Sequence, residues 1–152
     1  MNGTSKNARS AADFGGISRD EYTKFADRLK HVFLVGNLAH PSEHPFIREE
    51  RLEMILCFYG AGDDGLPHWH RDVTEYEIVV EGTIGYLDIS TGETQWFSVG
   101  DLSVVPAGRC VKRLVPQPAR TVAVKVPSRP GDKVHCQHCQ QECTARLKAY
   151  QG

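Results

Sequence analysis

The stretch from Gly62 to Gly82, GDDGLPHWHRDVTEYEIVVEG, constrains this chain more than any other segment. It contains two histidines that are two residues apart, His68 and His70, and then Glu75. On an extended strand, side chains at positions i and i+2 point to the same face, so the two imidazoles converge. The four residues before Glu75 are enough to turn a corner. The pattern therefore predicts a strand, a corner and a second strand around one point.

Two imidazoles and a carboxylate at one point form a ligand set for a divalent metal. Such a set, with open coordination positions, is typical of non-haem Fe(II) oxygenases, and other divalent metals also accept it. We therefore predict a metal site on His68, His70 and Glu75. Fe(II) is the favoured ion, and zinc, manganese and nickel are the alternatives.

The spacing of these residues resembles the first signature motif of the cupin superfamily. In that motif a glycine is followed after five residues by His-x-His, after four more by Glu and after six more by Gly. The five fixed positions fall here on Gly62, His68, His70, Glu75 and Gly82. The resemblance implies an all-β fold, the cupin-type jelly-roll barrel or double-stranded β-helix, with the metal ligands inside the barrel.

The second cupin motif is only partly present. Its pattern is Gly, five residues, Pro-x-Gly, two residues and a histidine ligand; Gly100, Pro106 and Gly108 match, but the ligand position is Val111. We favour a metal held by the first-motif residues alone, which leaves positions open for water, substrate or oxygen. A ligand recruited from elsewhere, such as Glu77, and loss of metal binding are the two alternatives.

Two further charged residues are predicted to face the same interior. Glu77 lies two positions after Glu75 and so shares its face of the strand. A second interior carboxylate is costly to bury, so Glu77 is either a general base with a raised pKa or the partner of Arg113 in an ion pair. Arg113 is also a candidate for bidentate binding of a substrate carboxylate. Glu77 and Arg113 are therefore the candidate catalytic residues.

The remaining sequence indicates an all-β domain preceded by one short helix. Ser18 to Glu21 forms a capping box, and apolar residues at helical spacing continue to about Lys30. Short β-branched and apolar runs then alternate with turns that often contain glycine or proline, as in sandwiches and barrels. We predict strands over 31–38, 52–59, around 68–70, 75–80, 84–89, 94–99, 102–105, 111–115 and 121–126. The expected divisions are a disordered tail (1–16), the barrel (17–130) and a Cys/His-rich tail (131–152).

The C-terminal tail carries a second group of metal-binding residue types. Cys136 and Cys139 form a CxxC pair, with His138 between them and Cys143 after them. Thiolates with one imidazole make a closed tetrahedral zinc site. We predict a second metal site there, for structural zinc or iron, with a flexible tail of reactive thiols as the alternative.

The tail and the first motif together show a weaker resemblance to 3-hydroxyanthranilate 3,4-dioxygenase. It rests on residues 71–75, on Glu81-Gly82 and on residues 134–139. That family opens an aromatic ring at an iron held by two histidines and one glutamate, and its bacterial members bind a second metal on C-terminal cysteines. The chain departs from it at Val111, where the family has a histidine, and in having one CxxC pair plus Cys143 where the family has two pairs.

These resemblances imply a metal-dependent enzyme with a dioxygenase-type reaction on a small substrate, anionic or aromatic in character. An isomerase or decarboxylase using zinc or manganese is the first alternative. A non-catalytic cupin that binds a small molecule is the second, and the missing second-motif histidine favours it.

Composition limits the classes of binding partner and the cellular location that we expect. A net charge of −1 offers no electrostatic case for binding nucleic acid or an anionic membrane. No run approaches the ~20 apolar residues of a membrane helix. The first 16 residues lack the apolar core of a signal peptide, and five cysteines are an odd number, so we expect a cytoplasmic protein. Similar cupins are often dimers, which implies a homodimer.

Overall fold

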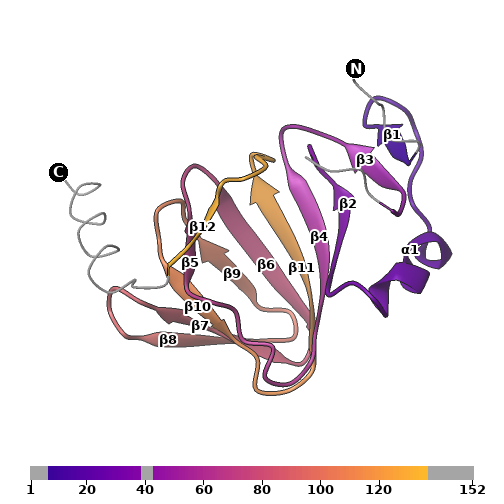
Figure 1. Ribbon diagram of the computed structural model, residues 1–152. Coiled ribbons are helices and arrows are strands. Elements are labelled where there is room, and N and C mark those ends of the chain that lie inside the picture. Colours follow the sequence, from indigo (N-terminus) through magenta and orange to yellow (C-terminus); the bar gives the residue numbers. More distant parts are fainter. Residues whose placement is uncertain (1–6, 39–42, 137–152) are drawn as a thin grey trace.

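Two β-sheets face one another in the computed structural model, which describes residues 7–38 and 43–136 (Figure 1). The larger sheet has seven strands, in the order β1 (Ala8–Ser10), β3 (Phe46–Arg48), β2 (His31–Val35), β4 (Glu53–Tyr59), β11 (Ala119–Val126), β6 (Thr74–Glu81) and β9 (Leu102–Val105). The smaller sheet has five, in the order β12 (Lys133–His135), β5 (His68–His70), β10 (Val111–Leu114), β7 (Thr83–Asp88) and β8 (Thr94–Ser98). The predicted all-β jelly-roll architecture is confirmed.

The core lies between the two sheets and follows the alternation of the strands. In β4 every second residue from Glu53 to Tyr59 is buried, so its inner face runs the length of the strand. The apolar residues that share this core come from both sheets: Ile55, Cys57, Tyr59, Val79, Ile84, Tyr86, Val105, Val111, Val115, Ala119 and Ala123. Cys57 is thus a small buried side chain of this core.

The first motif ends in a turn that only glycine fits. Gly82 has a φ of 76°, a left-handed conformation that L side chains rarely adopt. A Cβ at this position would lie 2.4 Å from the carbonyl oxygen of Pro118. The glycine thus allows β6 to reverse into β7 directly beside the turn that precedes β11.

Three strands were not predicted from the sequence: β1, β3 and β12. Each is three residues long, and β1 lies in the segment expected to be disordered, where it pairs in parallel with β3. β12 lies in the segment assigned to the C-terminal tail and pairs with β5. Such short strands have no detectable periodicity, and hydrogen bonds to their partner strands hold them in place.

The helix α1 (Arg19–Ala26) has the predicted capping box, in which the Glu21 carboxylate accepts from the Ser18 backbone N–H at 2.8 Å. It ends four residues before the predicted Lys30, with Asp27 as its C-cap. His44, in the loop before β3, is buried, and its ring centroid lies 5.6 Å from that of Phe25. No helix in the described ranges is both long enough and apolar enough to cross a bilayer.

Candidate metal centre

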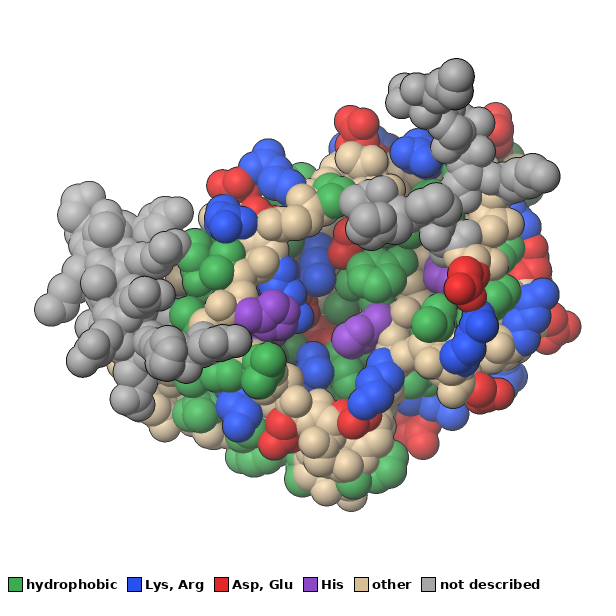
Figure 2. Space-filling view, viewed as in Figure 1, with side chains coloured by type: hydrophobic (Ala, Val, Ile, Leu, Met, Phe, Trp, Pro, Cys, Tyr) green, Lys and Arg blue, Asp and Glu red, His purple; other side chains and the backbone are tan. Residues whose placement is uncertain are grey.

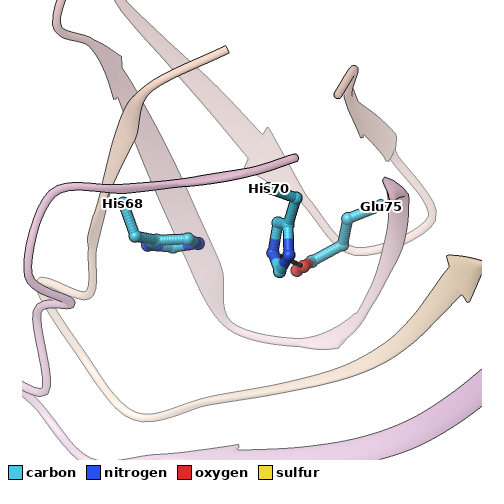
Figure 3. Close-up of side chains that lie close together, drawn as sticks. All are labelled: His68, His70 and Glu75. Carbon is cyan, nitrogen blue, oxygen red and sulfur yellow. Dashed lines mark ion pairs between the residues drawn. The ribbon is translucent and has the colours of Figure 1, made fainter. Parts of the chain in front are cut away.

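The three predicted metal ligands come together where the chain crosses from one sheet to the other (Figure 3). β5 in the smaller sheet carries His68 and His70, and β6 in the larger sheet carries Glu75. One ligand atom from each residue lies within 4.8 Å of the other two. The closest pair is Nε2 of His70 and Oε2 of Glu75, at 3.3 Å. The predicted strand, corner and strand therefore do bring the three side chains to one point.

His70 is the ligand whose surroundings most clearly favour a bound cation. Its side chain is only 4% exposed, and neither ring nitrogen has a hydrogen-bond partner of good geometry. A buried polar atom without a partner is costly and rare in folded proteins. A divalent cation between His70, His68 and Glu75 would accept the imidazole lone pair and remove that cost, so the residues present fit a metal.

A neighbouring oxygen lies at Nδ1 of each histidine. The Nδ1 of His68 is 3.1 Å from the carbonyl oxygen of Leu66, and the Nδ1 of His70 is 3.7 Å from Oδ2 of Asp132. Metal-binding histidines commonly donate their second ring N–H to a carbonyl or carboxylate, which sets the tautomer. Both rings can thus keep the proton on Nδ1 and present Nε2 to a metal.

Asp132 also holds the corner between the two ligand strands. Its carboxylate accepts backbone N–H groups of Asp72 and Val73 at 3.1–3.2 Å, and its carbonyl accepts from Arg71. It is 5% exposed. The sequence did not identify Asp132, because sixty residues separate it from this corner and only the fold brings the two together.

A row of alternating charges crosses three strands at the site. Lys125 on β11 pairs in register with Glu53 on β4 and with Glu75 on β6. Its Nζ lies 3.7 Å from Oε1 of Glu53 and 3.9 Å from Oε2 of Glu75. Lys125 was not predicted as a site residue, although a lysine within the apolar run of 121–126 is the signal that marks it.

The electrostatics keep the ligands in their metal-binding forms. Burial, reinforced by the positive charge of Lys133, lowers the pKa of His68 to about 3, so its imidazole is neutral. Burial by itself would raise the pKa of Glu75, but contact with His70 and the charge of Lys125 together lower it to about 2. A neutral imidazole and an ionised carboxylate are the states that bind a metal.

The second motif shapes the site without contributing a ligand. Val111 pairs directly with His68 and is buried in the core. Cys110, as alternation predicts, lies on the opposite side, where it packs in a cluster with Trp69. The turn of this motif is anchored to β5, because the N–H of Gly108 donates to the carbonyl of His70 at 2.7 Å.

Glu77 is a buried carboxyl surrounded by hydroxyl groups. It is 1% exposed, and its carboxylate lies 2.7 Å from the hydroxyls of Tyr86 and Thr121 and 3.5 Å from that of Tyr59. Burial and the nearby charge of Glu75 raise its pKa, despite the hydrogen bonds from these hydroxyls. The predicted interior position of Glu77 is therefore observed.

Arg113 points inward but does not form the suggested ion pair with Glu77. In the described part of the chain, no salt bridge joins the two residues; the Arg113 guanidinium lies 4.1 Å from the ring centroid of Tyr59 instead. Its Nη2 donates a long hydrogen bond to the Asp63 carbonyl at 3.4 Å, and its buried Nε has no partner. The guanidinium thus retains unused donor capacity.

A cavity of about 390 Å³ opens beside the metal centre, and Figure 2 shows histidine, basic and acidic side chains around such a hollow. Its lining combines His70 with Lys125, Lys133 and Glu53, and includes apolar groups such as Phe33. A small molecule in this cavity would meet both the metal position and two ammonium groups.

The predicted second metal site is only partly within the described residues. Cys136 is disulfide-bonded, so its sulfur is not a free thiolate there. Cys139, Cys143 and His138 lie outside the described residues. The second site therefore stays a prediction.

No family model and no curated protein matches the chain. Solved structures do resemble it. An uncharacterized conserved protein with a double-stranded β-helix domain from Klebsiella pneumoniae is 18% identical, with a TM-score of 0.51, over 58% of this chain and 76% of that one. The DMSP lyase DddQ from Ruegeria pomeroyi is 18% identical, with a TM-score of 0.58, over 74% of this chain and 54% of the lyase. The chain thus spans about half of the lyase, and such identities establish the fold alone.

Proposed function

We propose that this chain, which has the cupin fold, is a metal-dependent enzyme acting on a small molecule. The observation that carries the proposal is the meeting of His68, His70 and Glu75 at one buried point, with the ring nitrogens of His70 lacking hydrogen bonds. Three protein ligands leave coordination positions open, as catalytic metal sites do.

Fe(II) is the proposed metal, and a dioxygenase-type reaction is the first candidate. Two imidazoles and one carboxylate with open positions form the ligand set of non-haem iron oxygenases. When bound, the metal would supply Lewis-acid and template chemistry at the end of the cavity. The buried walls around His68 and His70 would exclude bulk water from that point.

The cavity suits an anionic substrate. Lys125 and Lys133 line it, and the unused donors of Arg113 lie in the same interior. A carboxylate on the substrate would gain charge-assisted hydrogen bonds from these groups while its reacting part faced the metal position. Arg113 is the proposed clamp, because its guanidinium is held over the Tyr59 ring, 4.1 Å from the ring centroid, and its buried Nε has no hydrogen-bond partner.

An isomerase or decarboxylase using zinc, manganese or nickel is the second candidate, and Glu77 favours it. A buried carboxyl with a raised pKa holds a proton near neutral pH more readily than an exposed one. Glu77 lies two residues from Glu75 on the same face, about 7 Å along the strand. We propose that it exchanges a proton with a substrate bound between it and the metal position.

A non-catalytic cupin that binds a small molecule is the third candidate, and the valine at position 111 favours it. A metal-content measurement separates these cases. We expect the protein, purified without oxygen, to hold close to one Fe(II), zinc, manganese or nickel ion in the barrel, and His70→Ala to lose it. His44→Gln, which changes a buried histidine outside the ligand group, should keep it. A wild-type barrel with no metal affinity would end the enzyme proposal.

The reaction class then follows from oxygen uptake. Iron-loaded protein that consumes O₂ with a small aromatic or aliphatic acid supports the dioxygenase. Turnover of such acids without O₂, retained with zinc or manganese, supports the isomerase or decarboxylase. Tight binding with no turnover in either condition supports the non-catalytic alternative.

We also propose that the protein is a homodimer, as the sequence predicts, and that it is cytoplasmic. An exposed apolar face of the larger sheet supports the dimer. Two rows of outward side chains cross four neighbouring strands in register: Leu56, Val122, Ile78 and Leu102 in one row, and Met54, Val124, Tyr76 and Val104 in the other. Four of these, Tyr76, Ile78, Leu102 and Val104, are 40–62% exposed. A second copy of the same apolar face is the simplest complement to it.

A further inference from the structure

We propose that His135, on the short strand β12, is a further ligand of the barrel metal and replaces the histidine that the second motif lacks. The inference rests on the proposed function, because it concerns the same metal. Unlike the other three ligands, His135 lies outside the first motif, since β12 belongs to the segment that the sequence assigns to the C-terminal tail. The tail would then contribute directly to the site in the barrel.

Strand pairing places His135 in the same relation to His68 as Val111. β5 lies between β10 and β12 in the smaller sheet. His68 is directly opposite Val111 on one side and directly opposite His135 on the other. Residues directly opposite one another in antiparallel strands project to the same face, with Cβ atoms about 5 Å apart. A histidine is thus available beside His68, on the other neighbouring strand.

The neighbours of His135 place it on the same face of the smaller sheet as the metal centre. Val134 pairs with Trp69 and packs against it in the cluster that contains Cys110, on the side away from the metal centre. Alternation then turns Lys133 and His135 to the inner face. Lys133 does line the cavity beside the metal centre, as this requires.

The distance between His135 and His68 is close to that between the two histidines of the candidate site. The rings of His68 and His70 have centroids 5.5 Å apart, and those of His68 and His135 are 6.2 Å apart. His135 lies outside the group of ligand atoms that are within 4.8 Å of one another, so its ring has to turn inward to reach the metal. Its side chain is exposed at the edge of the barrel, so core packing does not prevent this rotation.

The backbone of β12 is nevertheless held next to the site. Three residues of β12 pair with the three residues of β5, and the N–H of Cys136 donates to the carbonyl of Pro67 at 2.9 Å. Metal binding would therefore have to fix only the side chain of His135, not its backbone. With His135 the barrel would offer three imidazoles and one carboxylate, and a small substrate would still find open positions on an octahedral ion.

Metal affinity and imidazole counting test the inference. We would titrate metal-free protein with Co(II) against a chelator, and record pulsed EPR spectra of the Cu(II)-loaded protein, which count coordinated imidazoles. We expect His135→Ala to weaken Co(II) binding by at least the roughly 10- to 100-fold that the loss of a hydrogen-bond partner of a metal-binding histidine costs. The imidazole count should fall from three to two. His44→Gln is the control and should change neither value.

A rescue variant makes the test specific to the missing histidine. Val111→His combined with His135→Ala places an imidazole on the other side of His68. Recovered Co(II) affinity and a count of three in this variant support the inference. A wild-type count of two, or a count that His135→Ala leaves unchanged, overturns it while the three-ligand site stands. Wild-type protein that binds no Co(II), or binds it equally well with His70→Ala, overturns the proposed function instead.

Discussion

The two faces of β6 reverse the usual arrangement of a sheet that covers a core. The inner face carries the largely buried Glu75 and the buried Glu77 beside the apolar Val79, and the outer face carries Tyr76, Ile78 and Val80, which are exposed. In an ordinary antiparallel sheet the apolar side chains point inward and the polar ones outward. Val79 packs in the core, but the two inner carboxyls and the outer apolar side chains are not explained by the stability of the isolated chain and are better explained by something that binds to each face.

The inner face also differs in how its polar groups are paired. Glu75 contacts His70 and Lys125, whereas Glu77 is surrounded by neutral hydroxyls. Two carboxyls on one strand therefore have opposite environments, which lower the pKa of Glu75 and raise that of Glu77. Pairs of this kind often divide into a group that stays ionised and a group that carries a proton. The outer face has no such chemistry and offers only apolar area.

The largest effect is expected on turnover, from a change at Glu77, the proposed proton carrier on the inner face of β6. Glu77→Gln keeps the size of the side chain but cannot exchange a proton. If Glu77 is the proton carrier, turnover should fall by about 10²- to 10⁴-fold while metal content is unchanged. Steady-state kinetics with metal analysis on the same samples would check this. Full activity in Glu77→Gln would leave Glu77 with a structural role only.

The next effect concerns the support of the metal ligands. Asp132→Asn removes the charge next to Nδ1 of His70 and keeps one acceptor for the corner backbone. Metal affinity should fall by about 10- to 100-fold, as for other partners of metal-binding histidines. A chelator competition would measure it. Arg129→Gln, which removes a surface partner of Asp72 near the same corner, is the control and should leave affinity intact.

The outer face is tested by adding charge to it. Ile78→Lys and Leu102→Lys each place an ammonium group in the centre of the exposed rows, and a buried charge is not tolerated in an apolar interface. Both variants should sediment as monomers where the wild type sediments as a dimer. Their free energy of unfolding should change by no more than about 0.5 kcal/mol, as for other surface substitutions, when measured on monomeric protein. Glu93→Lys, on an exposed hairpin, should remain dimeric, and a monomeric wild type would refute the dimer.

The smallest effect is a pH dependence of stability that comes from His31 on β2, opposite the buried Cys57. Burial, together with the positive charges of Arg113 on β10, Lys133 on β12 and Lys125 on β11, lowers the pKa of His31 to about 4, although Glu75 opposes the shift. The unfolded chain binds a proton at His31 near pH 6.5, whereas the folded chain binds it only near pH 4. The free energy of unfolding therefore has its full value above pH 6.5 and decreases as the pH falls towards 4.

Replacing His31 by phenylalanine removes this titration and retains the edge-on contact with Tyr59. Between pH 7 and pH 4 the wild type should lose up to about 3 kcal/mol more stability than His31→Phe. Denaturant unfolding of both proteins at a series of pH values would measure the difference. Parallel curves for the two proteins would contradict the assignment.

Much of the candidate site was readable from local spacing. The interval between His68 and His70, and the corner before Glu75, predicted their convergence, and the alternation after Glu75 predicted that Glu77 is interior. Local spacing worked because strand geometry alone decides which face a side chain takes. It failed for the pairing of Glu77 with Arg113, because that depends on which of several neighbours each side chain reaches.

Other parts of the site depend on residues far apart in the sequence. Asp132 reaches the corner at Asp72, and Lys125 reaches Glu75, only because β11 and β12 lie beside the ligand strands. The pairing of the three-residue strand β12 with β5 follows from tertiary hydrogen bonds and leaves no periodic signal. His135 was therefore read as part of a tail.

By itself, the sequence determined that the chain is built from short strands and that two histidines and a glutamate share one point. These properties follow from the alternation of side chains along a strand, which acts over a few residues. The tertiary structure alone decided what surrounds that point: a hydroxyl shell around Glu77, the carboxylate of Asp132 behind His70, and β12 beside His68. Strand order and register set these contacts, and both are properties of the assembled sheets rather than of any local run of residues.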